Sequence, residues 1–172
     1  MPFPAPSDAS LDELAQQVLA ALRDRGERLA TAESCTGGWI AKVLTDVPGS
    51  SEAFDCGFVT YSNHAKQSLL EVPAGLIETH GAVSREVVEA MAFGAARFSR
   101  ATVTCSVSGI AGPGGGTEDK PVGTVWFGWR LPDGRLLSER QRFSGDREAV
   151  RRKAVLFALQ GVLKGLALVE EA

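Results

Sequence analysis

The sequence predicts a three-layer α/β/α fold, in which helices cover both faces of a mixed, mostly parallel sheet that includes one antiparallel hairpin. The first observation is that short β-rich runs alternate along the chain with segments whose apolar side chains recur at helical spacing. The second is a pair of β-rich runs, 122–131 and 135–143, joined by the turn signal Pro-Asp-Gly. Alternation predicts parallel strands, and the tight turn predicts the hairpin.

The first half of this pattern begins at Ser10, which forms a capping box with Glu13 and predicts a helix that Gly26 ends. Residues 28–32 predict a strand, which passes through a glycine turn into an apolar-periodic helix over 38–44.

The second half begins with a strand over 56–61, followed by a short helix with Asn63 as its cap. Ser84 is expected to cap a longer helix, and residues 101–107 predict a strand. After the hairpin, a last helix is expected to begin near Asp146 and to turn an apolar face to the core.

Length and composition predict one globular domain over residues 10–172, with 1–9 as a flexible arm. The chain has 172 residues, of which 44% are hydrophobic and 23% charged, and a formal net charge of -3. This balance gives no overall attraction to nucleic acid, and the basic clusters 140–142 and 151–153 are interpreted as solvated faces of a strand and a helix. No apolar run approaches the roughly 20 residues of a membrane span. Three scattered cysteines favour a reducing cytoplasm.

Three polar or glycine-rich segments follow predicted parallel strands: Glu33–Gly38, Tyr61–Lys66 and Ser108–Gly116. Ligands of α/β sheets usually lie beyond the carboxyl ends of the strands, so these segments predict one shared site. Glycines let a backbone approach a ligand closely, although such a cluster is a plain turn about as often as a binding loop. Neither of the two glycine-containing segments, Glu33–Gly38 and Ser108–Gly116, has the spacing of a nucleotide-triphosphate or dinucleotide loop.

Ser34 is the natural candidate nucleophile, because a turn from strand to helix presents its hydroxyl next to helix amides that can stabilise an oxyanion. Lys66 is the candidate base: the start of a helix and partial burial both disfavour an ammonium ion, although a solvated lysine is the plainer interpretation. Tyr61 could relay a proton, or could be a half-buried strand aromatic.

Other side chains compete for these roles. Cys35 is a rival nucleophile, since a thiolate at a helix start has a lowered pKa, but a small buried side chain is commoner. His64 could serve as a base, His80 is interpreted as structural, and Thr36 suits a cap or a substrate contact better than nucleophilic attack. The acidic residues form no metal-ligand pattern with either histidine, so neither a metal nor a cofactor is expected.

Five blocks of the sequence resemble the CinA C-terminal domain family in its stand-alone form, also known as nicotinamide mononucleotide amidohydrolases. The blocks are TAESCTGG, VPGSSEAFDCGFVTYSNHAK, HGAVS, SVSGIAGPGGGTEDKPVGTVWFG and FSGDREAVRRKA. They occur in order and cover nearly the whole chain after Ser10. The family's additional N-terminal domain, found in some members, is not expected in a chain of this length.

The resemblance implies the three-layer fold and hydrolysis of the carboxamide of nicotinamide mononucleotide to nicotinic acid mononucleotide and ammonia, a step of pyridine nucleotide salvage. It also implies a serine and lysine pair assisted by a tyrosine, which fall on Ser34, Lys66 and Tyr61, and it gives His64 no catalytic role. A cytoplasmic homo-oligomer such as a dimer is the implied assembly, without nucleic-acid or membrane partners.

Residues and resemblance together give a hypothesis of acyl transfer to Ser34, with amides near Thr36 to Gly38 holding the oxyanion. The ribose phosphate is expected at Gly109–Gly116 together with Ser51 and Arg147, because these combine amide donors, a hydroxyl and a planar cation. The predicted substrate-binding residues are Thr36, Gly37, Gly38, Ser51, Ser108, Gly109, Gly112 and Arg147. The alternative function is a pyridine-nucleotide sensor that binds through the same loops without catalysis.

Overall fold

A five-stranded sheet forms the middle layer of residues 3–172, the part of the chain that the computed structural model describes. Its strand order is β2-β1-β3-β4-β5. β1 pairs in parallel with β2 and β3, whereas β4 is antiparallel to both β3 and β5. The predicted mixed sheet with one hairpin is therefore confirmed. The strands are β1 (Leu29–Glu33), β2 (Phe54–Val59), β3 (Val103–Gly109), β4 (Thr124–Arg130) and β5 (Leu136–Arg142).

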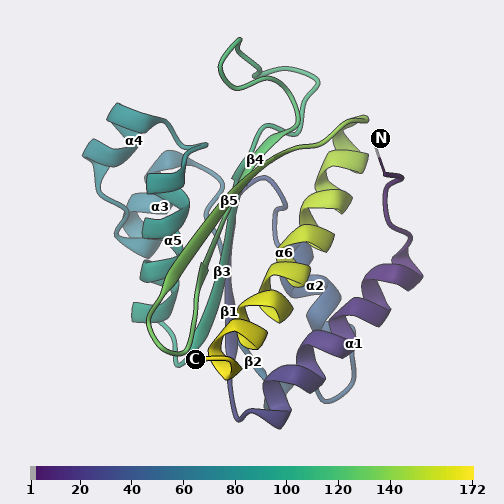
Figure 1. Ribbon diagram of the computed structural model, residues 1–172. Coiled ribbons are helices and arrows are strands. Elements are labelled where there is room, and N and C mark those ends of the chain that lie inside the picture. The colour runs from purple at the N-terminus through teal and green to yellow at the C-terminus, as the bar shows by residue number, and fades with distance from the viewer. Residues whose placement is uncertain (1–2) are drawn as a thin grey trace.

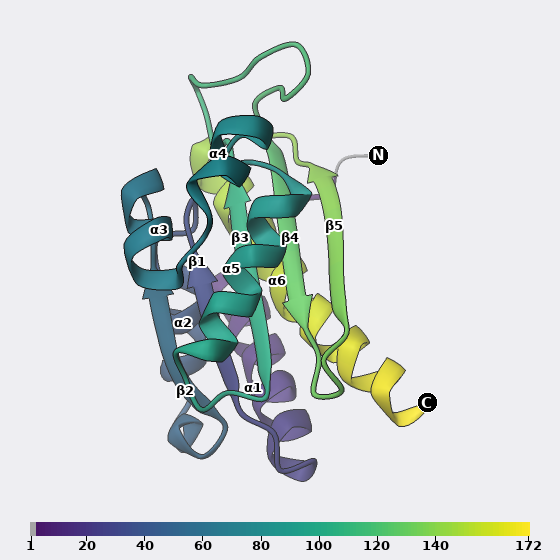
Figure 2. The ribbon, with the colours of Figure 1, turned by 90° about the vertical axis from the view of Figure 1, so that its left-hand side faces the viewer.

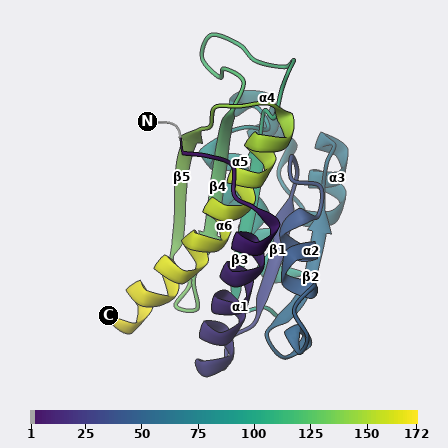
Figure 3. The same ribbon diagram turned by 90° about the vertical axis from the view of Figure 1, so that its right-hand side faces the viewer.

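Helices cover both faces of this sheet, as Figures 1 and 2 show from two sides. One face carries α1 (Asp8–Asp24), α2 (Trp39–Thr45) and α6 (Arg147–Glu170), which Figure 3 shows from the front. The other face carries α3 (Asn63–Leu70), α4 (Ala74–His80) and α5 (Arg85–Arg97). A 3-10 turn, η1 (Ser50–Glu52), precedes β2. The order of layers is the predicted α/β/α.

The two faces of the sheet bury separate apolar clusters, because side chains alternate along each strand. Along β4, Val125, Phe127 and Trp129 point into the larger cluster under α1, α2 and α6. Trp126, between them, packs with the smaller cluster under α5. The Phe127 and Trp129 rings stack with centroids 5.8 Å apart, and the Trp129 indole N–H donates to the carbonyl of Ala158 in α6.

Hydroxyl and carboxylate side chains begin the longer helices, as the sequence predicts for Ser84 and Asp146. Two predicted caps are wrong by a short distance. α1 begins at Asp8 with Ser7 as its cap, so the capping box at Ser10 does not form. α3 is capped by Ser62, whose hydroxyl accepts from the amide of Ala65, and not by Asn63.

The first helix thus begins inside the segment 1–9 that the sequence predicts as an arm. Phe3 lies edge-on to Phe143, and Arg152 of α6 donates to the Pro6 carbonyl. Residues 1–2 lie outside the described part of the chain. None of the described helices has both the length and the apolar character needed to cross a membrane.

Candidate active site

The carboxyl ends of β1, β2 and β3 meet at one pocket of about 310 Å³. The long loop after β3, which projects from the upper end of the molecule in Figure 2, contributes to the lining of this pocket. All three predicted segments contribute to its walls, so their predicted convergence is confirmed. The lining residues are Ser34, Cys35, Tyr61, Asn63, Lys66, Ala82, Val83, Ser108, Gly109, Ile110, Ala111, Gly112, Gly114, Gly115 and Arg147.

Ser34 and Lys66 face each other in this pocket. The Lys66 Nζ lies 3.0 Å from the Ser34 Oγ, and it also donates to the carbonyls of Thr60 at 2.9 Å and Tyr61 at 3.2 Å. The side chain is 1% exposed, and no carboxylate of the described residues forms an ion pair with it. Burial lowers the pKa of Lys66 below its ordinary value.

The contacts of Lys66 suit a base that must change its protonation state. A neutral amine has two N–H donors and one lone pair. In the structure the Nζ donates to the Ser34 Oγ, and the Ser34 hydroxyl donates to the Tyr61 carbonyl at 3.4 Å. In the neutral amine the carbonyls of Thr60 and Tyr61 can take the two donors, and the lone pair can then accept the proton of the Ser34 hydroxyl. The backbone at the end of β2 therefore orients the amine toward the serine.

Glu33, the last residue of β1, holds through its side chain the turn that carries Ser34. Its carboxylate accepts from the Thr36 hydroxyl at 2.7 Å and from the amides of Ile40 at 2.9 Å and Ala41 at 3.0 Å. These amides belong to the first turn of α2, where the N-cap residue is Gly38 and supplies no side-chain acceptor. Glu33 thus replaces the missing cap, although its burial raises the pKa of the carboxyl group.

Arg151 of α6 holds the same turn through its backbone carbonyls. Its guanidinium donates to the carbonyls of Cys35 at 3.0 Å and Thr36 at 3.2 Å, and lies over the Trp39 ring at 5.2 Å. The prediction that 151–153 is a solvated face is therefore wrong. Arg152 forms an ion pair with Asp8, and Lys153 is buried and donates to the Ser144 carbonyl.

Cys35 lines the pocket but does not suit the part of nucleophile. Burial, and next the nearby Glu33 charge, raise the pKa of its thiol to about 12. The thiol therefore stays protonated at neutral pH, and the rival interpretation as a helix-start thiolate is not supported.

Tyr61 is not a half-buried strand aromatic, because β2 ends at Val59 and the Tyr61 side chain is 61% exposed. Its phenol oxygen accepts from Arg147 at 3.1 Å, and Arg147 also donates to the Gly112 carbonyl at 2.8 Å. Arg147 thus bridges two walls of the pocket.

The predicted binding residues separate into two groups. Ser108, Gly109, Gly112 and Arg147 line the pocket. The remaining four, Thr36, Gly37, Gly38 and Ser51, do not.

For two of these four residues the physical reason is clear. Thr36 is buried with its hydroxyl bound to Glu33, so its side chain does not reach the pocket and only its backbone amide could serve there. Ser51 lies in η1 before β2, at the opposite end of the sheet, where its carbonyl accepts from Arg28. The histidines are also outside the pocket: His64 is exposed on α3, and His80 ends α4.

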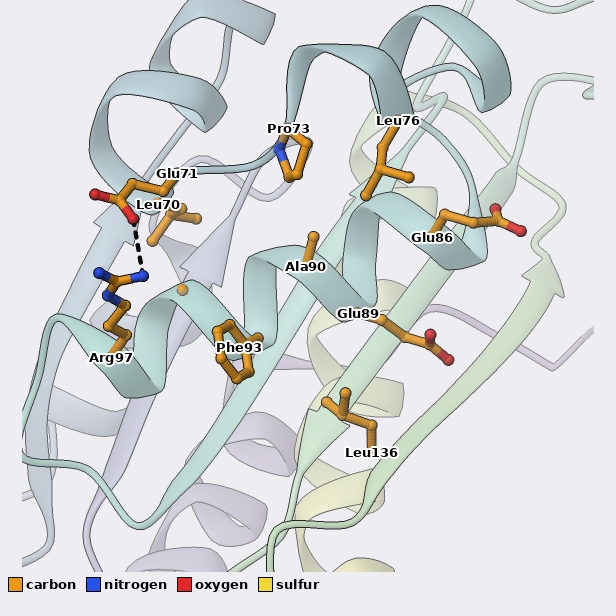
Figure 4. A pocket seen from close by; sticks show the side chains of 11 residues that line it. Leu70, Glu71, Pro73, Leu76, Glu86, Glu89, Ala90, Phe93, Arg97 and Leu136 are labelled. Carbon is orange, nitrogen blue, oxygen red and sulfur yellow. Dashed lines mark ion pairs between the residues drawn. The ribbon is translucent and has the colours of Figure 1, made fainter.

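A larger pocket of about 480 Å³ lies over α5 on the same side of the sheet (Figure 4). Its walls are mostly apolar, with Phe93 and Leu136 partly exposed, and its one ion pair joins Glu71 to Arg97 at 3.1 Å. No hydroxyl, thiol or lysine lines it.

Within residues 3–172, no cluster of three histidine, cysteine or acidic side chains suggests a metal centre. The smaller pocket is therefore the candidate active site.

The fold and the pocket define an α/β protein whose site is built around a buried lysine and a serine at a strand-to-helix turn. The chain belongs to the CinA C-terminal domain family, whose model matches residues 11–166. The predicted resemblance is confirmed.

Individual relatives cover nearly the whole chain. It is 54% identical to nicotinamide-nucleotide amidohydrolase PncC of Escherichia coli strain K12 over 90% of this chain and 93% of that protein. The protein of the same name from Enterobacter agglomerans is 55% identical over 92% of this chain and 96% of its own length. The crystal structure of the competence/damage inducible protein CihA from Agrobacterium tumefaciens matches with a TM-score of 0.88 and 41% identity, covering 95% of this chain and 98% of that one.

Proposed function

We propose that the chain is an amidohydrolase that converts nicotinamide mononucleotide to nicotinic acid mononucleotide and ammonia by acyl transfer to Ser34. The names of its relatives support the amidohydrolase class and the substrate. The contact between the Ser34 Oγ and the buried Lys66 Nζ carries the mechanism. A serine hydroxyl is a weak nucleophile unless a base lies within hydrogen-bond reach, and this lysine supplies one.

The reaction divides into two steps. Neutral Lys66 takes the Ser34 proton as the Oγ attacks the carboxamide carbon, and the carbon–nitrogen bond then breaks as Lys66 returns the proton to the leaving ammonia. Water, deprotonated by the same amine, attacks the resulting ester and releases the carboxylic acid and the free serine. Lys66 acts as base and acid in turn, which requires the lowered pKa that burial provides.

The developing oxyanion needs hydrogen-bond donors close to Ser34. The amides of Cys35 and Thr36 have no backbone acceptor among the described residues, whereas the Gly37 amide donates to the Ser34 carbonyl. We therefore assign the oxyanion to the first two amides and not to the predicted glycine amides.

The nucleotide part of the substrate is assigned to the wall of the pocket that Arg147 and the loop 111–116 form. Arg147 supplies a planar cation, and the amides of the loop 111–116 have no backbone acceptor in the described part of the chain. Such amides and a guanidinium suit a phosphate group. Tyr61, held by Arg147 at the pocket mouth, is proposed to donate a proton or contact the substrate.

The test is to incubate the pure chain with nicotinamide mononucleotide and to measure released ammonia and nicotinic acid mononucleotide. Turnover that disappears in Ser34→Ala, with substrate binding retained, supports the proposal. Binding without turnover by the unaltered chain contradicts it and favours the nucleotide sensor.

A further inference from the structure

We propose that Arg151 is a positioning residue, which holds the peptide group between Cys35 and Thr36 so that its N–H faces the reacting carbonyl oxygen. The role rests on the proposed acyl transfer to Ser34. Arg151 does not line the pocket, and it would act only through the backbone that it binds.

The direction of the peptide group follows from its carbonyl. A trans peptide is planar, with its C=O and N–H pointing in opposite directions. The Cys35 carbonyl accepts from Arg151 Nε on the α6 side of the turn, so the Thr36 N–H points away from α6. Lys66 approaches Ser34 from α3, on the other face of the sheet. The N–H therefore points toward the side on which attack occurs.

The carbonyls of the two neighbouring peptide groups also accept hydrogen bonds. The Ser34 carbonyl is occupied by the Gly37 amide, and the Thr36 carbonyl accepts from Trp39 and from Arg151 Nη2. All three carbonyls of the turn thus have donors. Within residues 3–172 the amides of Cys35 and Thr36 have no backbone acceptor, as a preformed oxyanion site requires.

Arginine suits this task better than lysine. Its planar fork can donate to two carbonyls at once, and stacking on an aromatic ring fixes the plane of the fork. Arg151 shows both features, with contacts to two successive carbonyls and the Trp39 ring 5.2 Å away. No acidic side chain of the described residues pairs with it, so its charge and donors are directed to the turn alone.

Arg152 provides a matched control. It is the next residue of α6, and its guanidinium also lies over Trp39, at 5.0 Å. Its hydrogen bonds go instead to Asp8, Glu148 and the Pro6 carbonyl, away from the turn that carries Ser34. Arg152→Lys therefore repeats the chemical change of Arg151→Lys without touching the peptide group.

The experiment compares Arg151→Lys and Arg151→Gln with Arg152→Lys and the unaltered chain. Steady-state kcat and KM for nicotinamide mononucleotide are measured together with the rate at which a fluorophosphonate labels Ser34. The phosphoryl oxygen of this reagent uses the same amides and does not depend on the substrate assignment. Folded fractions are compared by thermal unfolding.

We expect both Arg151 variants to lose about 10- to 100-fold in kcat and in labelling rate, less than or comparable to the loss of a whole oxyanion donor. KM should stay within about threefold, because the amides of the turn bind the oxyanion in the transition state more strongly than they bind the substrate carbonyl. Arg152→Lys should match the unaltered chain in both readouts.

Several outcomes overturn the role of Arg151: labelling at the unaltered rate in Arg151→Lys, a change in KM alone, a loss of activity that tracks a loss of folded protein, or no labelling of Ser34 in the unaltered chain. If labelling depends on Arg151 but nicotinamide mononucleotide is not hydrolysed, the substrate assignment fails and the positioning role stands.

Discussion

Replacing Lys66 by methionine removes the amine while keeping an unbranched apolar stem of similar length. The structure gives this amine one contact to Ser34, the proposed nucleophile, at 3.0 Å, and two to backbone carbonyls. A general base of this kind contributes about 10²- to 10⁴-fold to rate. We therefore expect kcat/KM for nicotinamide mononucleotide to fall by about that factor, which corresponds to about 3 to 5 kcal/mol of transition-state stabilisation.

The variant should remain folded. The carbonyls of Thr60 and Tyr61 lose a donor, at a cost of about 1 kcal/mol each. Removing a buried amine offsets part of this cost, since burial disfavours its charged form. Thermal unfolding should therefore show a small change in stability beside a large change in rate.

Lys66→Arg separates a base from a mere positive charge, because arginine has no accessible neutral form. It should be as inactive as the methionine variant. Ammonia release is the assay for both, with the Arg152→Lys variant as the control for a distant change of side chain. Substantial turnover by Lys66→Arg at neutral pH would refute Lys66 as the base and would leave Tyr61 to be tested.

The pH dependence follows from the lowered pKa of Lys66. The proposed mechanism requires the neutral amine, so kcat/KM should rise with pH through an apparent pKa below that of a free lysine. Stability should change in the same direction. Between the lowered pKa of the folded chain and the ordinary pKa of the unfolded chain, the unfolded state binds one more proton, so the free energy of unfolding rises with pH relative to Lys66→Met.

Three other predictions concern separate features of the molecule. Cys35→Ala should retain most ammonia release, because the thiol stays protonated at neutral pH; an inactive variant with an active Ser34→Ala would show that the nucleophile is misassigned. Dialysis against a strong chelator should leave activity unchanged, and recovery on adding a divalent ion after a loss would contradict this. Gly161→Ala should lower the free energy of unfolding by about 1 to 3 kcal/mol, because the new methyl group would overlap the Trp129 ring; an unchanged melting temperature would disprove it.

The proposed catalytic pair could be named from the sequence because its signals are local. Ser34 follows a buried β-rich run at a turn into a helix, and Lys66 lies in the first turns of a capped helix. Even a cap misplaced by one residue left Lys66 near that helix start. The shift of β2 from 56–61 to Phe54–Val59 mattered more, because it moved Tyr61 out of the strand and onto the rim of the pocket.

The supporting residues could not be found this way. Arg151 reaches Cys35 across 116 residues of sequence, and it lies in a run of basic residues whose pattern fits a solvated helix equally well. Glu33 caps α2 from a position before the turn, where capping rules do not look for a side chain. The place of Ser51 could not be read from the sequence, because only the pairing of β1 with β2 shows that it lies at the far end of the sheet.

The most direct test of the central claim is to quench the unaltered chain during turnover of nicotinamide mononucleotide and to map the modified peptide by mass spectrometry. The account predicts an ester on Ser34 with the mass of the substrate less ammonia, absent in Ser34→Ala and accumulating too slowly to detect in Lys66→Met. An adduct on Cys35, or full turnover by Ser34→Ala, would contradict it.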